Sequence, residues 1–213
     1  TVSLDTLRAD RFRALTRFDH LDAVLAGVEA AADTFGGLKI DTVVMRGVNE
    51  ADVVPLAEFC LQHGYRLRFI EQMPIGPQHG WDRASMVPAA EILELLGGHF
   101  ALSPVQGRGS APAEEWLVAA GDCHPSGSVG VIASVTQAFC RDCTRARLST
   151  EGKLYTCLFA SEGFDLRSLL REGGDDDTLR VVVNSYRAGG GGGYRAIGKA
   201  PRLWTSGTLV RDA

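Results

Sequence analysis

The stretch KIDTVVMRGVNEADVVPLAEFCLQHGYRLRFIEQM, residues 39–73, decides the fold. Residues 39–45 are rich in β-branched side chains and predict a buried parallel strand. Residues 51–63 place apolar side chains at helical spacing and stop at Gly64, which predicts a helix. Residues 65–73 predict the next strand. This order of strand, helix and strand is the unit of a parallel sheet or barrel.

The residues before this stretch extend the same alternation. Residues 2–5 predict the end of a strand, and residues 20–33 carry an amphipathic helical stripe. A closed (β/α) barrel needs eight strands and roughly 200 or more residues. Three strands are too few, and the first begins with no upstream neighbour. We therefore interpret residues 1–87 as the C-terminal part of a larger, incomplete barrel of the TIM type.

The pattern changes after residue 87. Residues 88–183 predict a small α+β region, and residues 184–213, with five consecutive glycines, predict a disordered tail. The elements expected in the α+β region are a helix from residue 88, strands at 100–102, 114–118 and 128–132, a hairpin around Glu151–Gly152, and a helix at 165–172.

The composition excludes several classes of protein. The chain has 213 residues, 45% of them hydrophobic and 23% charged, with a net charge of −4. This mild acidity argues against a nucleic-acid binder, although one basic pocket for a small anion fits it. No apolar run approaches the ~18 residues of a membrane span, and the first residues form no secretory signal. We expect a soluble cytoplasmic protein.

The cysteines suggest a metal site rather than disulfides. The chain has five cysteines, which is an odd number, and it has no signal for secretion. Cys140 and Cys143 form a C-x-x-C pair, and the expected hairpin could return Cys157 to the same point. Both zinc and an iron–sulfur cluster bind thiolates in such spacings. Zinc would take Cys123 or His124 as its fourth ligand, and the spacing alone leaves both alternatives open.

Two arginines follow the C-x-x-C pair. Arg145 and Arg147 alternate, so on a strand both side chains would point to one face. Two solvated arginines on an exposed strand are the plain alternative. Beside a metal site, however, two guanidinium groups form a good clamp for an anion or a purine.

These residues resemble the GTP 3',8-cyclases, radical S-adenosylmethionine enzymes that begin molybdenum cofactor synthesis. The resemblance rests first on CRDCTRARLSTEGKLYTCLF, residues 140–159, which is similar to the second-cluster signature of that family. Four other segments carry it further, so that it extends over residues 1 to about 175: VSLDTL (2–7), MRGVNE (45–50), LRFIEQMPIG (67–76) and GVIASVTQAFC (130–140).

The resemblance implies a role for nine residues. Cys140, Cys143 and Cys157 would hold a second [4Fe–4S] cluster, whose fourth iron stays open for the guanine of GTP. Cys123 is then a bystander. The residues implied to bind the two small molecules are Lys39, Arg145, Ala146 and Arg147 for GTP, and Ser3 and Met73 for S-adenosylmethionine. Arg68 and Glu71 lie near the same barrel mouth and receive no role.

The resemblance also implies a further cluster-binding motif and partner proteins. The family converts GTP to (8S)-3',8-cyclo-7,8-dihydroguanosine 5'-triphosphate with a first [4Fe–4S] cluster, but its C-x-x-x-C-x-x-C motif is absent from these 213 residues. We expect a chain that is inactive alone or is completed by a separate N-terminal half. A homodimer and cyclic pyranopterin monophosphate synthase are the other partners considered. Two alternatives remain: a non-enzymatic nucleotide-binding module with zinc or an iron–sulfur cluster, and a degenerate gene product.

Overall fold

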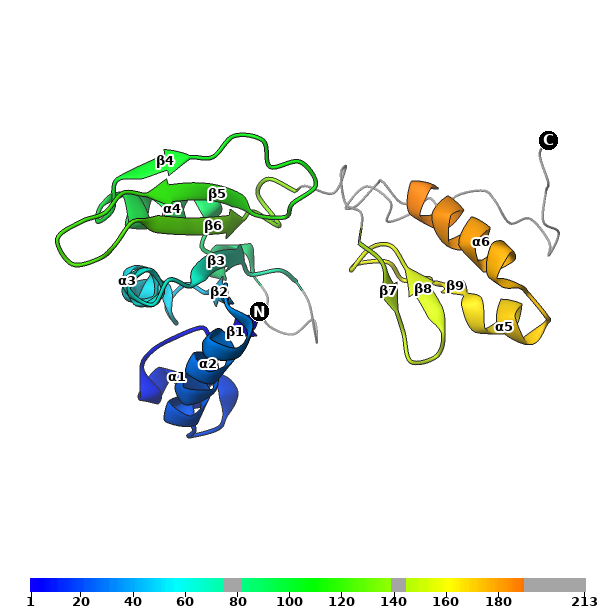
Figure 1. The fold of residues 1–213 in the computed structure, drawn as a ribbon, viewed down its shortest axis with the longest axis horizontal. Helices are drawn as coiled ribbons and strands as arrows, with labels where there is room; N and C mark the ends of the chain where they lie inside the picture. Colours follow the sequence, from blue (N-terminus) through cyan, green and yellow to red (C-terminus); the bar gives the residue numbers. More distant parts are fainter. Residues whose placement is uncertain (75–81, 139–144, 190–213) are drawn as a thin grey trace. The chain divides into compact units, whose positions relative to one another are not determined.

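The structure is a computed structural model, and it describes residues 1–74, 82–138 and 145–189 (Figure 1). The chain divides into two compact units, residues 1–137 and 138–213. Within the described residues, no helix is both long and apolar enough to cross a membrane.

The first unit is built on a six-stranded mixed sheet. Its order is β1-β2-β3-β6-β5-β4, in which β1, β2, β3 and β6 run parallel, β5 pairs antiparallel with β6, and β4 pairs antiparallel with β5. The strands span Val2–Ser3 (β1), Lys39–Val44 (β2), Arg66–Glu71 (β3), Leu102–Pro104 (β4), Glu114–Val118 (β5) and Gly127–Ile132 (β6). The mixed α/β class expected from the sequence is confirmed.

Helices pack against one face of this sheet. They span Ala9–Thr16 (α1), Leu21–Phe35 (α2), Val53–Gln62 (α3) and Ala89–Gly97 (α4), with short 3-10 turns at Glu50–Asp52 (η1) and Arg83–Ser85 (η2). Both α3 and α4 contact β3 and β6. Phe69 of β3, Leu56 of α3 and Ile92 of α4 are at most 1% exposed at the centre of the core. Burying each such side chain stabilises the fold by about 1.5–3 kcal/mol.

Burial alternates along β2, which corrects the expectation of a strand buried on both faces. Ile40 and Val44 are fully buried on the helix side, whereas Lys39, Asp41 and Val43 are half-buried on the other. The reason is that the helices cover only one face of the sheet among the described residues. Polar side chains are therefore tolerated on the opposite face, as in sheets with one open side.

The second unit contains a three-stranded antiparallel sheet and two helices. The strands are Arg147–Leu148 (β7), Lys153–Tyr155 (β8) and Phe164–Asp165 (β9). The hairpin expected around Glu151–Gly152 is confirmed by the pairing of β7 with β8. The helices span Leu166–Arg171 (α5) and Asp176–Gly189 (α6).

Two boundaries differ from those expected. The units divide after Gln137 rather than at residue 87, because β6 pairs in parallel with β3 and so joins both expected regions in one sheet. Helix α6 continues to Gly189, past the expected start of the tail at residue 184. The rest of the tail, residues 190–213, lies outside the described residues.

Candidate functional site

The open face of the first unit's sheet carries a row of polar side chains. Ser3 is level with Asp41 of β2, and Asp41 is level with Arg68 of β3. Residues at paired positions share a face, so these three side chains form one row across three strands. Lys39 lies two residues earlier on the same face of β2, about 7 Å along the strand.

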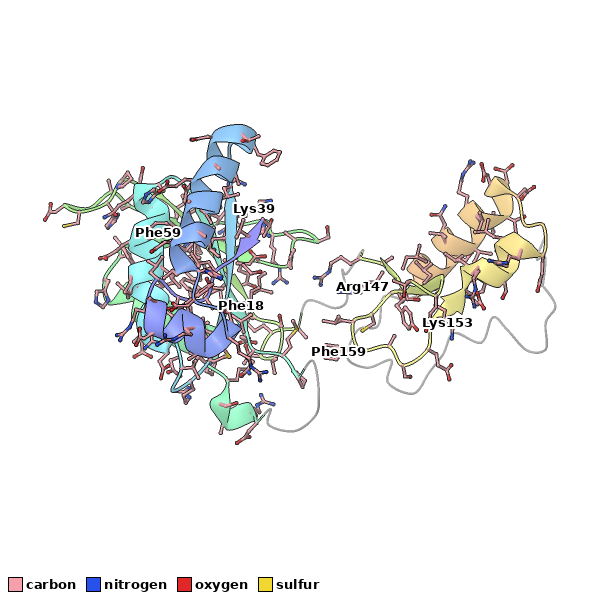
Figure 2. The ribbon with its side chains drawn as sticks, turned by 90° about the horizontal axis from the view of Figure 1, so that it is seen from below. Phe18, Lys39, Phe59, Arg147, Lys153 and Phe159 are labelled. Carbon is pink, nitrogen blue, oxygen red and sulfur yellow. The ribbon has the colours of Figure 1, made fainter. Side chains whose placement is uncertain are left out.

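Among the first unit's predicted site residues, Ser3 and Lys39 are thus brought to one face. Ser3 is exposed and Lys39 is half-buried. Met73 lies beyond the carboxyl end of β3, whereas Lys39 begins β2 at the other end of the sheet. The sheet therefore separates Lys39 from Met73 along the strand direction. Figure 2 labels Lys39 among the side chains of this unit.

A buried amide ties the carboxyl ends of β1 and β2 together. The Nδ2 of Asn49 donates to the carbonyl oxygens of Asp5 and Val43, each at 2.9 Å, and its Oδ1 accepts from the Met45 N–H at 2.8 Å. The Asp5 carboxylate in turn accepts from the Val43 N–H at 2.8 Å. Burial raises the pKa of Asp5, and the Val43 hydrogen bond opposes that shift.

Glu71 forms a second polar centre at the carboxyl end of β3. Its side chain is 0% exposed. Its Oε1 accepts from the Ala89 N–H at 2.8 Å, and its Oε2 accepts from the N–H groups of Val135 and Thr136 at 2.7 and 2.8 Å. The Thr136 hydroxyl also donates to Oε1. Glu71 has no role that the sequence alone predicts, because its partners are far away along the chain.

The hairpin of the second unit carries the arginines and one of the three predicted cysteine ligands. Arg147, labelled in Figure 2, is half-buried on β7, and it lies opposite Tyr155 of β8. Arg145 lies just before the strand, so the alternation that would place both arginines on one face does not apply to it. Arg145 and Cys157 each lie two residues beyond the Arg147–Tyr155 pair, on opposite arms of the hairpin. Arg145 and Ala146 are both exposed.

Cys157 has a half-buried thiol. Its sulfur accepts from the Phe159 N–H at 3.4 Å. The other two predicted ligands, Cys140 and Cys143, lie outside the described residues. No metal-binding group of His, Cys, Asp or Glu occurs within the described ranges, which hold only one of the three predicted cysteines. Cys60 is buried and Cys123 is exposed, and both are free thiols.

Comparison with known proteins supplies the family. The model of Molybdenum Cofactor Synthesis C matches residues 65–188. The chain belongs to that family. The matched segment begins just before β3 and ends within α6, so it contains Glu71, the hairpin and all three predicted cysteine ligands.

Curated relatives agree with this family. The chain is 50% identical to a GTP 3',8-cyclase of Corynebacterium glutamicum over 84% of its own length and 48% of that protein's. It is 48% identical to one of Paenarthrobacter nicotinovorans, over 84% of this chain and 53% of the relative. It is 45% identical to one of Streptomyces coelicolor, over 89% of this chain and 57% of the relative. The chain spans about half the length of these relatives, and the resemblance found in its sequence is confirmed.

Proposed function

We propose that the chain is the part of a GTP 3',8-cyclase that holds the second iron–sulfur cluster and the base end of GTP. It would act in molybdenum cofactor biosynthesis, in the conversion of GTP to (8S)-3',8-cyclo-7,8-dihydroguanosine 5'-triphosphate. The observation that carries the proposal is the register of the hairpin, which places Arg145 and Cys157 at the same open end of its two strands. Cys143 lies two residues before Arg145 in the sequence.

The described cysteine fits a cluster ligand. Cys157 follows β8, is half-buried, and its sulfur already accepts a backbone N–H from Phe159. Hydrogen bonds to sulfur are one means by which proteins tune iron–sulfur clusters. With Cys140 and Cys143 as the other ligands, a [4Fe–4S] cluster would keep one iron free to accept a donor atom of guanine. Three thiolates also suit zinc, so metal analysis is the deciding test.

The chain's own charged residues would bind the nucleotide. Arg145 and Arg147, with the Ala146 backbone between them, would donate hydrogen bonds to GTP. A guanidinium offers five N–H donors in a fixed planar arrangement, which suits purine edges and anionic oxygens. Lys39, on the open face of the first unit's sheet, would contribute a point charge to the triphosphate.

The first unit would be the barrel portion of the enzyme. Four of its strands are parallel, and the open face of their sheet carries the row of Ser3, Asp41 and Arg68. Ser3 and Met73 would contact S-adenosylmethionine. The motif that holds the family's first [4Fe–4S] cluster is not among these 213 residues, so that cluster would be held by other residues. A homodimer, and cyclic pyranopterin monophosphate synthase as the enzyme that takes the product, complete the proposal.

Metal analysis after anaerobic reconstitution tests the proposal. We expect about four iron atoms and four acid-labile sulfides per chain. Alanine at Cys140, Cys143 or Cys157 should remove most of both, whereas Cys123→Ala should change neither. Stoichiometric zinc without sulfide would contradict the proposal and favour a zinc-bearing nucleotide module.

GTP provides the second arm of the test. Adding GTP to the reduced chain should change the electron paramagnetic resonance spectrum of the cluster, because a donor atom of guanine would occupy the open iron. Production of 5'-deoxyadenosine should require a separately prepared N-terminal half from a related cyclase. A spectrum that GTP leaves unchanged would contradict the placement of the base at the cluster.

A further inference from the structure

An open pocket lies at the amino ends of β2 and β3, beside the second half of α2. Its volume is about 480 Å³, which is within the range of small-molecule sites. Two helix residues line it, Glu29 and Asp33 of α2. The segment that connects α3 to β3 lines it as well, through His63, Gly64 and Tyr65.

The two carboxylates give this pocket a negative charge. Glu29 and Asp33 are four residues apart on α2, so their side chains project from the same face of the helix. Both residues are exposed, and within the described part of the chain neither forms an ion pair. No lysine or arginine is among the described residues that line the pocket. The pocket therefore favours a cation over an anion.

His63 adds a hydrogen-bond acceptor. Its Nδ1 lies 2.8 Å from the carbonyl oxygen of Phe59, a residue of α3 that is labelled in Figure 2. A carbonyl oxygen can only accept, so Nδ1 carries the proton and donates it. In the neutral imidazole the Nε2 atom then keeps its lone pair and can accept an N–H from a ligand.

Tyr65 is the residue that points to a ligand. Only 8% of the residue is exposed, and its hydroxyl makes no hydrogen bond within the described residues. Burial and, after it, the charges of Glu29 and Asp33 raise the pKa of Tyr65, so the hydroxyl lies within electrostatic reach of both carboxylates. The hydroxyl of a buried tyrosine usually finds a hydrogen-bond partner. Here a donor that enters the pocket would supply one.

The spacing of the acceptors distinguishes a metal ion from a larger cation. Among the described residues, no three His, Cys, Asp or Glu side chains are placed to hold a metal ion. A guanidinium group spreads one charge and five N–H donors over a plane, so it can reach acceptors that are further apart. Its flat face also suits the rings of His63 and Tyr65, which are stacked with their centroids 5.4 Å apart and their planes at 26°.

We propose that this pocket binds a guanidinium group, carried either by an arginine side chain of a polypeptide or by free arginine. Glu29 and Asp33 would pair with its charge, and the Nε2 of His63 and the hydroxyl of Tyr65 would accept its N–H groups. The site lies wholly within the first unit. The proposal depends neither on the metal site nor on GTP, and it stands if either of those is refuted.

An NMR titration of the full chain at about 0.15 M ionic strength tests the proposal. The probe is N-acetyl-arginine N-methylamide, which represents an arginine within a polypeptide. Its lysine counterpart has the same charge on an ammonium group, and its citrulline counterpart keeps the planar shape without the charge. We expect saturable shifts of the Gly64 and Tyr65 amide signals with the arginine probe, binding about threefold weaker with the lysine probe, and none with the citrulline probe.

Free arginine separates the two sources of the group. Tighter binding of the free amino acid than of the capped probe would assign the pocket to a small molecule. Weaker binding would assign it to an arginine side chain of a polypeptide, because the α-carboxylate of the free amino acid adds a negative charge near Glu29 and Asp33.

Three variants and one control test the residues. Glu29→Gln and Asp33→Asn should each weaken binding of the arginine probe about threefold, because exposed ion pairs are screened by solvent. Tyr65→Phe keeps the ring and removes the hydroxyl, and it should also weaken binding about threefold. Asp22→Asn is the matched control. It removes the same charge from an exposed position of α2 that does not line the pocket, so affinity should not change.

Several results would overturn the proposal. The first is a wild-type chain that shows no saturable shift with the arginine probe. Equal affinity for the arginine and lysine probes, or binding of the citrulline probe, would also refute a guanidinium site. Equal weakening in Asp22→Asn and Glu29→Gln would show attraction by net charge alone and would refute it too. If Tyr65→Phe does not fold, unchanged affinity in both carboxylate variants overturns the proposal instead.

Discussion

Arg147 lies directly opposite Tyr155 in the outermost pair of the β7–β8 hairpin. This register determines which residues emerge together from the open end of the hairpin, and it places Arg145 and Cys157 at the same distance along the two arms. The turn at the other end sets the register. Gly152 in that turn has φ +81° and accepts, through its carbonyl oxygen, the N–H groups of Leu166 and Arg167.

Gly152→Ala should therefore damage both the hairpin and the metal site. A Cβ at this position would lie 2.6 Å from the Cβ of Arg167, and the positive φ adds backbone strain. We expect a loss of about 2–3 kcal/mol in the free energy of unfolding. Iron content after reconstitution should fall with it, because Cys157 would no longer return to the level of Arg145. Chemical denaturation and iron analysis measure the two effects.

Gly173→Ala is the control for backbone strain alone. Gly173 has φ +93°, but a Cβ there would meet nothing within 4 Å. This variant should cost only about 1–2 kcal/mol and keep its iron. Equal losses of stability in the two variants would show that contact with Arg167 contributes nothing.

Arg145→Ala and Arg147→Ala should weaken GTP binding without removing the cluster. A charge-assisted hydrogen bond contributes about 1.5–3 kcal/mol, so each variant should lose roughly tenfold to a hundredfold in affinity. Calorimetry with the reconstituted chain measures the loss. Arg180→Ala is the control, since Arg180 is exposed on α6 and pairs with Asp177. Unchanged affinity in both site variants would refute the proposed clamp.

Cys60 should be inert toward thiol reagents in the folded chain. Burial raises the pKa of its thiol from 9.0 to about 12. At pH 8 only about one Cys60 thiol in ten thousand would be the reactive thiolate. Iodoacetamide followed by mass spectrometry should modify exposed Cys123 and leave Cys60 unmodified until the chain is unfolded. Rapid modification of Cys60 under native conditions would show that this part of the core opens readily.

Local sequence patterns were enough to predict much of the first unit. Strands β2 and β3 and helices α2 and α3 follow from β-branched runs, amphipathic stripes and terminal glycines. Helix α6 was missed, because the five consecutive glycines from residue 189 resemble a linker and indicated a disordered tail. A capping signal was available: the Asp175 carboxylate accepts the Thr178 N–H at 2.8 Å.

The parts that were not predicted depend on contacts between distant residues. Glu71 lies 64 residues before Val135, and no periodicity relates them. The parallel pairing of β3 with β6 is equally non-local, and it moved the boundary between the units. For the site, the family resemblance could indicate residue roles but not that Arg145 lies before the strand.

Asp5 should make the stability of the first unit depend on pH. Burial raises the pKa of Asp5 above its ordinary value of 3.8, so the folded chain binds this proton more tightly than the unfolded chain does. Its contribution is then fully present below pH 3.8 and is lost as pH rises through the folded pKa. Asp5→Asn cannot ionise, and its side-chain oxygen can still accept the Val43 N–H.

As pH rises from about 3.5 to 7, the wild type should therefore lose the stability contributed by Asp5. Asp5→Asn should not lose it, so the free energy of unfolding of the variant should rise relative to that of the wild type. Denaturation curves at several pH values measure it. Asp10→Asn should show the opposite trend, because its hydrogen bond with Arg8 lowers the pKa of Asp10, and that contribution is lost as pH falls. Since Asp10 is exposed, the opposite trend should be shallow and should weaken in salt. If the Asp5 difference stays constant across this range, burial does not govern the titration of Asp5.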